Sequence, residues 1–305
     1  LADVPFHCEV FFLTTVHTLA SGSSGNAAVL SCGDTHLLLD AGISCRRITT
    51  ALNALGLSPE LLSAILITHT HSDHISGLRT LLKKTDCPIL ATPRTCRELC
   101  CRFEGIDGRL MELEAPVQIG EVGITPVITS HDAPGSCGWR LDTGDGSVGF
   151  LTDTGYVTEE AADLLPGVDL AILEANHDVE ALRSGPYPYY LKQRILGTEG
   201  HLCNEDAAAF AVTLAEQGAG EIVLNSIDTD GVKQGFDLEM LDALAARVHV
   251  PIIASGGAGN MEHFAELFTH PGIDAGLAAS IFHTHQVDIK ELKRFLRGRG
   301  VEMRV

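Results

Sequence analysis

The sequence predicts an α/β protein in which a mixed first part is followed by a regular series of strand–helix units. Three observations predict this class. The chain has 305 residues, of which 45 % are apolar and 20 % charged, as in globular proteins of one or two domains. Short β-branched segments alternate with helical segments. Polar side chains also gather where several predicted strands end, as expected at one edge of a sheet.

The first part of the chain is rich in predicted strands. Apolar, β-branched segments separated by turns of Ser, Gly and Asn indicate them. We expect strands at residues 10–19, 27–31, 36–40, 64–68, 88–91, 123–129, 139–142, 147–152 and 170–174. Apolar residues at helical spacing predict helices at 44–55, 75–84 and 204–217.

The composition changes near residue 220. All nine cysteines, the tryptophan and the four tyrosines precede residue 204, and residues 221–305 carry only −4 of the net charge of −19. Strands are expected at 221–227, 250–254 and 275–279, and helices at 237–247, 261–268 and 288–297. This alternation is typical of parallel βα units. We therefore expect two domains, residues 1–220 and 221–305.

Charge and cysteine content narrow the possible partners and location. The chain has 21 basic and 40 acidic residues, which disfavours a non-specific grip on nucleic acid but leaves room for a local basic groove. An odd number of cysteines without an export signal predicts reduced thiols and a cytoplasmic protein. The sequence contains no run of 18 apolar residues, so we expect no membrane span.

A histidine-rich motif, HTHSDH at residues 69–74, follows the predicted strand 64–68. It contains three imidazoles and one carboxylate, from His69, His71, His74 and Asp73. Such mixed nitrogen and oxygen donors suit zinc, manganese or iron, whereas the alternative is a solvated histidine-rich turn. His131 and Asp153 end two later predicted strands. Their position favours a metal site.

These segments together resemble the metallo-β-lactamase fold superfamily, whose HxHxDH motif and later His and Asp bind two metals. The segment LDAG at 39–42 supplies the aspartate that supports the metal ligands in that superfamily. Four further segments resemble the YycJ-type (WalJ-like) branch, which is linked to phosphodiester and DNA hydrolysis. They are LASGSSGN at 19–26, EANHD at 174–178, YPYYLK at 187–192 and GHLCNE at 200–205, in which Cys203 replaces a usual serine.

The resemblance covers about residues 11–220 and implies an αββα sandwich with one or two divalent metals. The metals, zinc or else manganese or iron, would turn a bridging water into hydroxide for attack on a phosphodiester, such as DNA or RNA. The implied roles are His69, His71 and His131 for the first metal, Asp73 and His74 for the second, Asp153 as a bridge, Asp40 as outer support, and Asp73 and His201 in catalysis.

Three assignments within this resemblance stay open. His201 is either a general acid, as in related tRNA-processing enzymes, or a histidine at the start of a helix. His177 either faces the substrate or is structural. The turn at 21–26 either offers backbone amides to a phosphate or is a plain hairpin turn.

From residue 218 the sequence resembles a different family, the cyclase subunit of imidazole glycerol phosphate synthase. The matching segments include GAGEIVLNSID at 218–228 and PIIASGGAG at 251–259. That family is a TIM barrel, and this chain contains only its last three βα units, without the units that hold the two catalytic aspartates. The resemblance implies a phosphate site at Asp230, Gly231, Ser255, Gly256, Gly257, Ala279 and Ser280, unless these loops were inherited without function.

The junction between the two resemblances affects the second metal. The YycJ-type branch ends its next strand with a histidine that completes this site, and Ser226 aligns with it here. We therefore expect a metal-dependent hydrolase with an impaired second site. The alternatives are a phosphate-binding remnant of the cyclase, a lyase of histidine biosynthesis, and a non-catalytic chimera. Exposed strand edges in the fragment also favour self-association.

Overall fold

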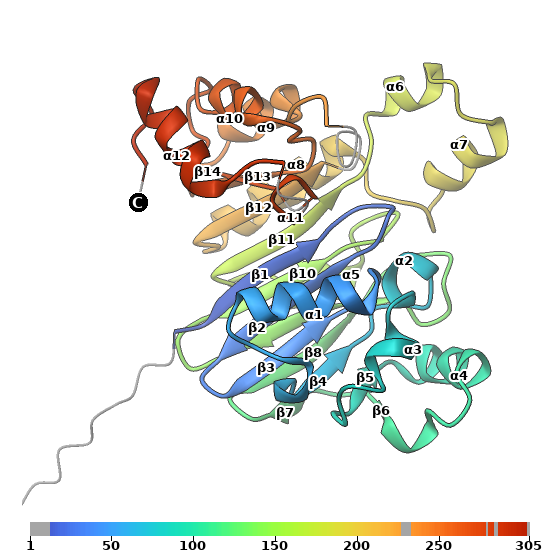
Figure 1. Cartoon of the computed structure of the whole chain (residues 1–305). Helices are drawn as coiled ribbons and strands as arrows, with labels where there is room; N and C mark the ends of the chain where they lie inside the picture. Colours follow the sequence, from blue (N-terminus) through green and yellow to red (C-terminus); the bar gives the residue numbers. More distant parts are fainter. Residues whose placement is uncertain (1–12, 227–232, 279, 284–285, 304–305) are drawn as a thin grey trace, which may run out of the picture.

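The computed structural model describes residues 13–226, 233–278, 280–283 and 286–303, and two face-to-face β-sheets form its centre (Figure 1). The first sheet has the order β1-β2-β3-β4-β5-β6, antiparallel from β1 to β3 and parallel from β3 to β6. Its strands are β1 Thr15–Ala20, β2 Ala27–Cys32, β3 Thr35–Leu39, β4 Ala64–Leu66, β5 Ile89–Ala91 and β6 Leu110–Glu112.

The second sheet has eight strands in the order β14-β13-β12-β11-β10-β9-β8-β7. Neighbours are antiparallel from β7 to β10 and parallel from β10 to β14. Its strands are β7 Val117–Ile119, β8 Val122–Ile128, β9 Cys137–Asp142, β10 Ser147–Leu151, β11 Leu170–Ala175, β12 Glu221–Ser226, β13 Ile252–Ser255 and β14 Ala275–Leu277.

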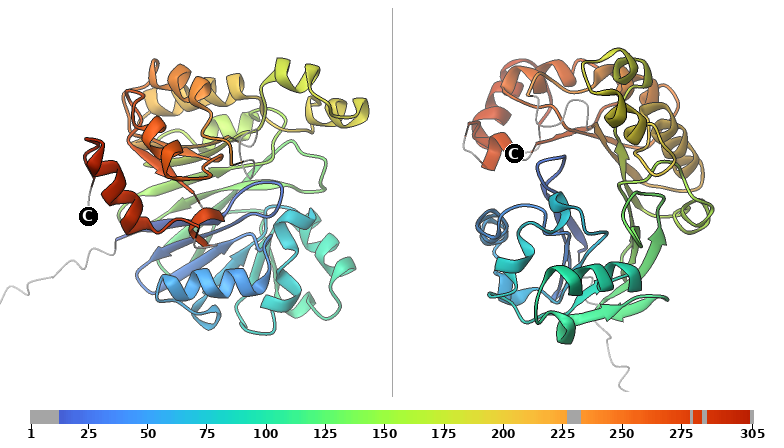
Figure 2. Two further views of the ribbon diagram at one scale, coloured as in Figure 1. Left: turned by 45° about the horizontal axis from the view of Figure 1, so that its top comes forward. Right: turned by 90° about the vertical axis from the view of Figure 1, so that its right-hand side faces the viewer.

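Helices cover the outer faces of both sheets (Figure 2). They are α1 Cys45–Ala54, α2 Ser72–Ile75, α3 Leu78–Leu81, α4 Pro93–Arg102, α5 Glu159–Leu164, α6 Val179–Ser184, α7 Tyr189–Ile195, α8 Asn204–Glu216, α9 Leu238–Ala245, α10 Met261–Leu267, α11 Ser280–His283 and α12 Ile289–Gly298, with short 3₁₀ helices at Pro59–Leu61 and Asp107–Arg109. Within the described residues, none of the helices is both long and apolar enough to cross a bilayer.

Three apolar layers hold this αββα arrangement together. Fully buried Leu30, Leu37 and Trp139 lie between the two sheets. Ile48 and Leu99 pack helices α1 and α4 on the first sheet. A third cluster packs the second sheet against helices that include α8, α9, α10 and α12. Burying large apolar side chains on both faces of each sheet is the main stabilising contribution.

Local signals explain where several helices begin. The side chains of Ser44, Thr92 and Thr158 accept hydrogen bonds from backbone amides in the first turns of α1, α4 and α5. The thiol of Cys203 occupies the corresponding position of α8 and accepts from the Asp206 amide at 3.4 Å. Cys203 thus replaces a stronger oxygen acceptor at a helix start.

Two predicted elements differ from the structure. The helix expected at 75–84 is two short helices, α2 and α3, separated at Gly77. The Gly77 amide donates to the Ala41 carbonyl at 2.8 Å and not to the preceding turn, and a Cβ at Gly77 would lie 2.0 Å from the Ile43 carbonyl oxygen, so only glycine fits there. The helix also starts earlier, inside the histidine motif. The strand expected at 10–19 begins at Thr15, and its first residues lie outside the described part.

The second sheet is continuous across the residue where the sequence changes resemblance. β12 pairs in parallel with β11 over six residue pairs, from Leu170–Glu221 to Ala175–Ser226. On its other side β12 pairs in parallel with β13, which pairs with β14. The three C-terminal units therefore extend the sandwich and form no closed barrel among the described strands.

Candidate metal centre

Polar side chains from both sheets meet at one end of the sandwich. Asp40 and His69 follow β3 and β4 of the first sheet, whereas His131 and Asp153 follow β8 and β10 of the second. Asp40, His69, His74, His131 and Asp153 are buried. Burial of this many ionisable groups is costly unless they bind one another or a cation.

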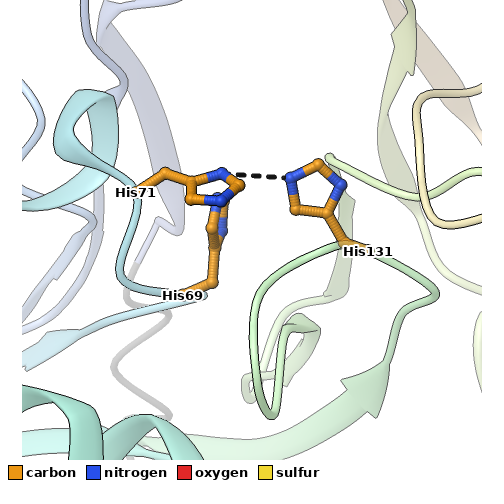
Figure 3. A group of neighbouring side chains, drawn as sticks. All are labelled: His69, His71 and His131. Carbon is orange, nitrogen blue, oxygen red and sulfur yellow. Dashed lines mark hydrogen bonds between the residues drawn. The ribbon is translucent and has the colours of Figure 1, made fainter. Parts of the chain in front are cut away.

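His69, His71 and His131 converge (Figure 3). Their ligand nitrogens all lie within 4.8 Å of one another, and Nδ1 of His71 lies 3.2 Å from Nε2 of His131. Two nitrogens bound to one tetrahedral zinc at about 2.0–2.1 Å would be about 3.3–3.4 Å apart. The spacing of the two rings fits a shared metal ion.

The outer nitrogens of two rings have partners that leave Nε2 directed inward. Nδ1 of His69 lies 3.0 Å from Oγ1 of Thr68, and Nδ1 of His131 lies 2.9 Å from the Gly200 carbonyl oxygen. Nε2 of His69 is buried and has no hydrogen-bond partner. Burial lowers the pKa of His69 well below its usual value, which favours the neutral, metal-binding form. An unpartnered neutral nitrogen here is what a metal ligand requires.

A second group consists of His69, His74 and Asp153, whose ligand atoms also lie within 4.8 Å of one another. Oδ2 of Asp153 lies 3.2 Å from Nε2 of His74, and Oδ1 lies 4.0 Å from Nε2 of His131. Asp153 thus presents one oxygen to each group of histidines. Oδ2 of Asp73 lies 3.6 Å from Nε2 of His74. The structure therefore brings together all six residues predicted as metal ligands.

Asp40 orients His74 from behind. Its Oδ2 lies 2.7 Å from Nδ1 of His74, and its Oδ1 accepts from the Thr68 amide at 2.9 Å. Asp40 itself has a positive φ of 58°, which is uncommon outside glycine. The next turn passes so close to the motif that a Cβ on Gly42 would lie 1.6 Å from the Asp73 carbonyl oxygen. The segment LDAG thus fits the tight packing around His74.

The electrostatics of this end favour bound positive charge. Burial opposes protonation of His74, but the carboxylates of Asp40 and Asp153 raise its pKa well above the usual value. Burial likewise opposes ionisation of Asp153, yet the neighbouring His74 holds the pKa of that carboxyl well below its usual range. A cation is stabilised between these carboxylates. A divalent metal ion bound here would supply such a charge.

His201 pairs with a carboxylate that sequence patterns did not single out, Glu174. Its Nδ1 lies 2.7 Å from Oε1 of Glu174 and 3.4 Å from Oδ1 of Asp153. Burial opposes a charge on His201, but the Glu174 and Asp153 carboxylates raise its pKa to about 9. Oε2 of Glu174 also accepts from the Asp153 amide at 2.5 Å. In the sequence, Glu174 is part of the EANHD segment that resembles the YycJ-type branch, but the resemblance did not give it a role.

A cavity of about 640 Å³ opens beside these residues. His71, Asp73, Asp153 and His201 line it, together with the turn at 21–23. The side chain of Asn26, a second residue that sequence patterns left without a role, lies 3.1 Å from Nε2 of His74. The turn therefore borders the site and contributes to it through Asn26.

His177 also lines the cavity, and its Nδ1 is buried without a hydrogen-bond partner. Burial lowers the pKa of this histidine, which favours the neutral ring. Its position allows either of the two roles considered from the sequence.

Ser226, at the end of β12, does not face the cavity, although it aligns with the histidine that completes the second metal site in the YycJ-type branch. Side chains alternate along a strand, and Leu224 faces the helix-side core. Ser226 lies on that same side and its Oγ is 3.1 Å from Oδ2 of Asp237, at the start of α9. Asn225 points the other way and lines the cavity. The cavity-facing position of β12 is therefore Asn225.

The residues of the predicted phosphate site are only partly described. Asp230, Gly231 and Ala279 lie outside the described residues, and Ser280 is described only as the first residue of α11. Ser255 ends β13, lines the cavity and donates to Oδ1 of Asn225 at 2.7 Å. Gly256 and Gly257 follow it with φ of 94° and 92°. The predicted order of three adjacent parallel strands is present, since β12, β13 and β14 are neighbours.

Comparison with known proteins identifies two segments. Residues 35–223 match the beta-lactamase superfamily domain, and residues 195–288 match the histidine biosynthesis protein family. The two matches share residues 195–223, which contain α8 and the first half of β12. The chain is 50 % identical over 100 residues to imidazole glycerol phosphate synthase subunit HisF of Chlorobium phaeobacteroides, covering 33 % of this chain but only 40 % of that relative.

The longer match concerns the metal-binding part. The chain is 37 % identical over 233 residues to exodeoxyribonuclease WalJ of Streptococcus pneumoniae, covering 74 % of this chain and 87 % of the relative. The metallo-beta-lactamase fold protein YhfI from Bacillus subtilis shares the fold, with a TM-score of 0.58 and 19 % identity over 80 % of this chain and 98 % of that chain. The chain therefore belongs to the metallo-β-lactamase-fold hydrolase family, and its C-terminal segment resembles the histidine biosynthesis family.

Proposed function

We propose that this protein is a metal-dependent phosphodiesterase that acts on DNA. The observation that carries the proposal is the convergence of His69, His71 and His131 beside the group of His69, His74 and Asp153. The similarity to a relative named exodeoxyribonuclease supports DNA as the substrate class. RNA is the alternative substrate of the same chemistry.

The residues present fit divalent metals. In our assignment His69, His71 and His131 would hold the first metal, Asp73 and His74 would hold the second, and Asp153 would serve both. Zinc suits the nitrogen-rich first group best, and manganese or iron are alternatives. Such metals supply Lewis acidity and lower the pKa of water. The orphaned Nε2 of His69 supports this assignment independently of sequence resemblance.

The chain's own residues account for proton transfer and orientation. His201, protonated beside Glu174, is positioned to give a proton to the leaving oxygen of the substrate. Glu174 keeps Nδ1 of His201 occupied, so the proton is given from Nε2. Asp40 and Gly200 fix the rings of His74 and His131.

The eight cysteines of the described part are free thiols, which supports a reducing compartment such as the cytoplasm.

The proposal is tested with protein stripped of metal by chelation and reloaded with zinc or manganese. Release of nucleotides from end-labelled DNA should depend on the added metal. His69→Ala and His131→Ala should each lower metal affinity at least about 10–100-fold, since loss of an outer partner alone has that effect. His249→Ala, an exposed histidine of the C-terminal segment, is the matched control. DNA cleavage that needs no divalent metal would contradict the proposal.

We also propose that the C-terminal segment retains phosphate binding at Ser255, Gly256 and Gly257, together with Asp230, Gly231, Ala279 and Ser280. The favouring observation is that Ser255 lines the same cavity as Asp73 and His201. Both glycines have positive φ, a backbone conformation that glycine adopts readily and that lets the backbone amides of a loop approach an anion. Inorganic phosphate binding, measured by calorimetry, should weaken in Ser255→Ala. Unchanged binding would exclude Ser255 from the site.

Self-association is the third proposal, because β14 is the last strand of its sheet in the described part. An unpaired edge offers backbone donors and acceptors to a second chain. Sedimentation velocity over a range of protein concentrations tests it. A strictly monomeric protein would contradict it.

A further inference from the structure

Three tyrosines stand exposed on an arm beside the metal centre. The arm comprises residues 178–199 and contains α6 and α7, which project from the sandwich (Figures 1 and 2). Tyr187, Tyr189 and Tyr190 are 54 %, 77 % and 75 % exposed. They account for three of the four tyrosines of the chain. Exposed rings this close together in sequence need an explanation other than core packing.

Hydrogen bonds attach the arm to the loop that contains His131, and Leu182 is the one residue of its two helices that is buried. Helix α7 has no buried residue. Instead, both carboxylate oxygens of Asp132 accept from Arg194, and the Asp132 amide donates to the Glu199 carbonyl at 2.9 Å. Oγ of Ser130 donates to the Thr198 carbonyl at 2.8 Å. These bonds join the arm to the residues on either side of His131. A ligand that binds the arm is therefore held at a fixed position relative to the metal centre.

The rings lead into the cavity. Tyr187 lines it together with Leu191, Arg194 and His201. Pro186 and Pro188 flank Tyr187, and their fixed φ angles restrict the backbone on both sides of that ring. Tyr189 and Tyr190 follow at the start of α7, and both are largely exposed. A long substrate that leaves the cavity past Tyr187 would have two further exposed rings nearby in the chain.

The charges of the arm argue against a grip based mainly on phosphate. The arm has three acidic and three basic residues. Its cations already have acceptors, since Arg194 binds Asp132, Lys192 donates to the carbonyls of Arg183 and Gly185, and Arg183 pairs with Glu180. The whole chain carries −19. Aromatic rings hold unpaired bases by stacking, without needing an excess of positive charge.

We infer that Tyr187, Tyr189 and Tyr190 form a stacking platform for unpaired bases of a single-stranded nucleic-acid end, which it delivers to the metal centre. The inference rests on the proposed function and adds a substrate requirement to it. Tyr187 contacts the base nearest the scissile phosphodiester, and Tyr189 and Tyr190 contact bases further out. Recognition through ring faces tolerates any base sequence.

Binding is measured by fluorescence anisotropy on the full chain in excess chelator, so that cleavage does not interfere. The probes are a labelled thymidine oligomer and an abasic oligomer of the same length, which has the same phosphates but no bases. The unmodified protein should prefer the thymidine oligomer. Each of Tyr187→Ala, Tyr189→Ala and Tyr190→Ala should weaken its binding about 5–10-fold, the lower end of the range for stacked rings, and leave abasic binding unchanged.

Matched variants separate stacking from general effects. The Tyr→Phe variants should retain the preference because they keep the ring. Leu61→Ala, which removes another exposed apolar side chain that does not line the cavity, should have no effect. Equal affinity for the two oligomers, or Ala variants that bind like the unmodified protein, would overturn the inference. So would tyrosine variants that abolish self-association and leave oligomer binding intact, because the rings would then be a contact between copies.

Failure of the proposed function gives a different result. If the protein prefers the thymidine oligomer through its tyrosines but never cleaves DNA with metal, the platform stands and the hydrolase assignment fails. If metal-dependent cleavage occurs without any base preference in binding, the hydrolase stands and the platform fails.

Discussion

Nδ1 of His74 lies 2.7 Å from Oδ2 of Asp40, and both side chains are almost fully buried. This bond joins the end of β3 to the HTHSDH motif and turns Nε2 of His74 toward Asp153. Asp40 also accepts from the Thr68 amide and hydroxyl, so a single carboxylate holds His74 and the residue that precedes the motif. Metal ligands in proteins commonly have such an outer partner.

Asp40→Asn should weaken binding of the second metal about 10–100-fold, because the amide is a weaker partner for His74 and carries no charge. Binding of the first metal should change less, since Thr68 and Gly200 contact His69 and His131 directly. Metal competition titrations measure both sites. Asp34→Asn, on the exposed turn between β2 and β3, serves as the control. Equal losses at both sites would show that Asp40 supports the motif as a whole.

Glu174→Gln should lower kcat more than it raises KM, because Glu174 acts on His201 and not on the substrate. Loss of the carboxylate should also lower the pKa of His201 from about 9, so less of it is protonated at neutral pH. His201→Ala should reduce kcat about 10²–10⁴-fold, the usual range for a general acid. Steady-state kinetics on DNA measure these effects. Glu180→Gln, on the exposed face of α6, should behave like the unmodified enzyme.

Asn225→His should strengthen binding of the second metal, because Asn225 is the polar residue of β12 that lines the cavity and lies nearest the end of the strand. Ser226→His should not, and it should destabilise the protein by placing an imidazole where Oγ now contacts Asp237. Metal stoichiometry and thermal melting distinguish the two variants. A gain of metal in Ser226→His alone would mean that the alignment, and not strand alternation, identifies the ligand position.

Cys203→Ser should stabilise the protein by about 0.5–1 kcal/mol, because a hydroxyl is a better acceptor than a thiol for the Asp206 amide at the start of α8. For a chain of this size, the melting temperature should rise by about 1–3 °C. Differential scanning calorimetry measures the change. Cys101→Ser, an exposed thiol without a capping contact, should leave the melting temperature unchanged. A lower melting temperature for Cys203→Ser would show that the thiol packs better than it caps.

The sequence predicts the polar end of the sandwich better than its edges. His69 follows a strand of the first sheet, and His131 and Asp153 follow strands of the second, so all three lie at the same end of the sandwich and the motif with two later residues was enough to locate the group. Glu174 and Asn26 act through single hydrogen bonds to His201 and His74. Such partners depend on tertiary distances that no local pattern contains.

Strand pairing was the larger gap. Nothing local to residues 221–226 indicates whether β12 pairs with β11 as well as with β13. A buried parallel strand has the same apolar character whichever neighbours it has. The break between α2 and α3 was missed for a similar reason. The Gly77 amide donates to the Ala41 carbonyl, which is distant in sequence, and this interrupts the hydrogen bonds of the helix.

The pairing of β12 on both sides has a consequence for how the chain unfolds. Exchange of backbone amides in β11, β12 and β13 should be slowed together, because opening any one of these strands exposes the hydrogen bonds of its neighbours. The segment from the histidine biosynthesis family then melts with the hydrolase in one transition, where an independently tethered domain would melt in its own. A proteolytic cut near residue 220 would accordingly release no folded piece, since each half covers an edge that the other half needs.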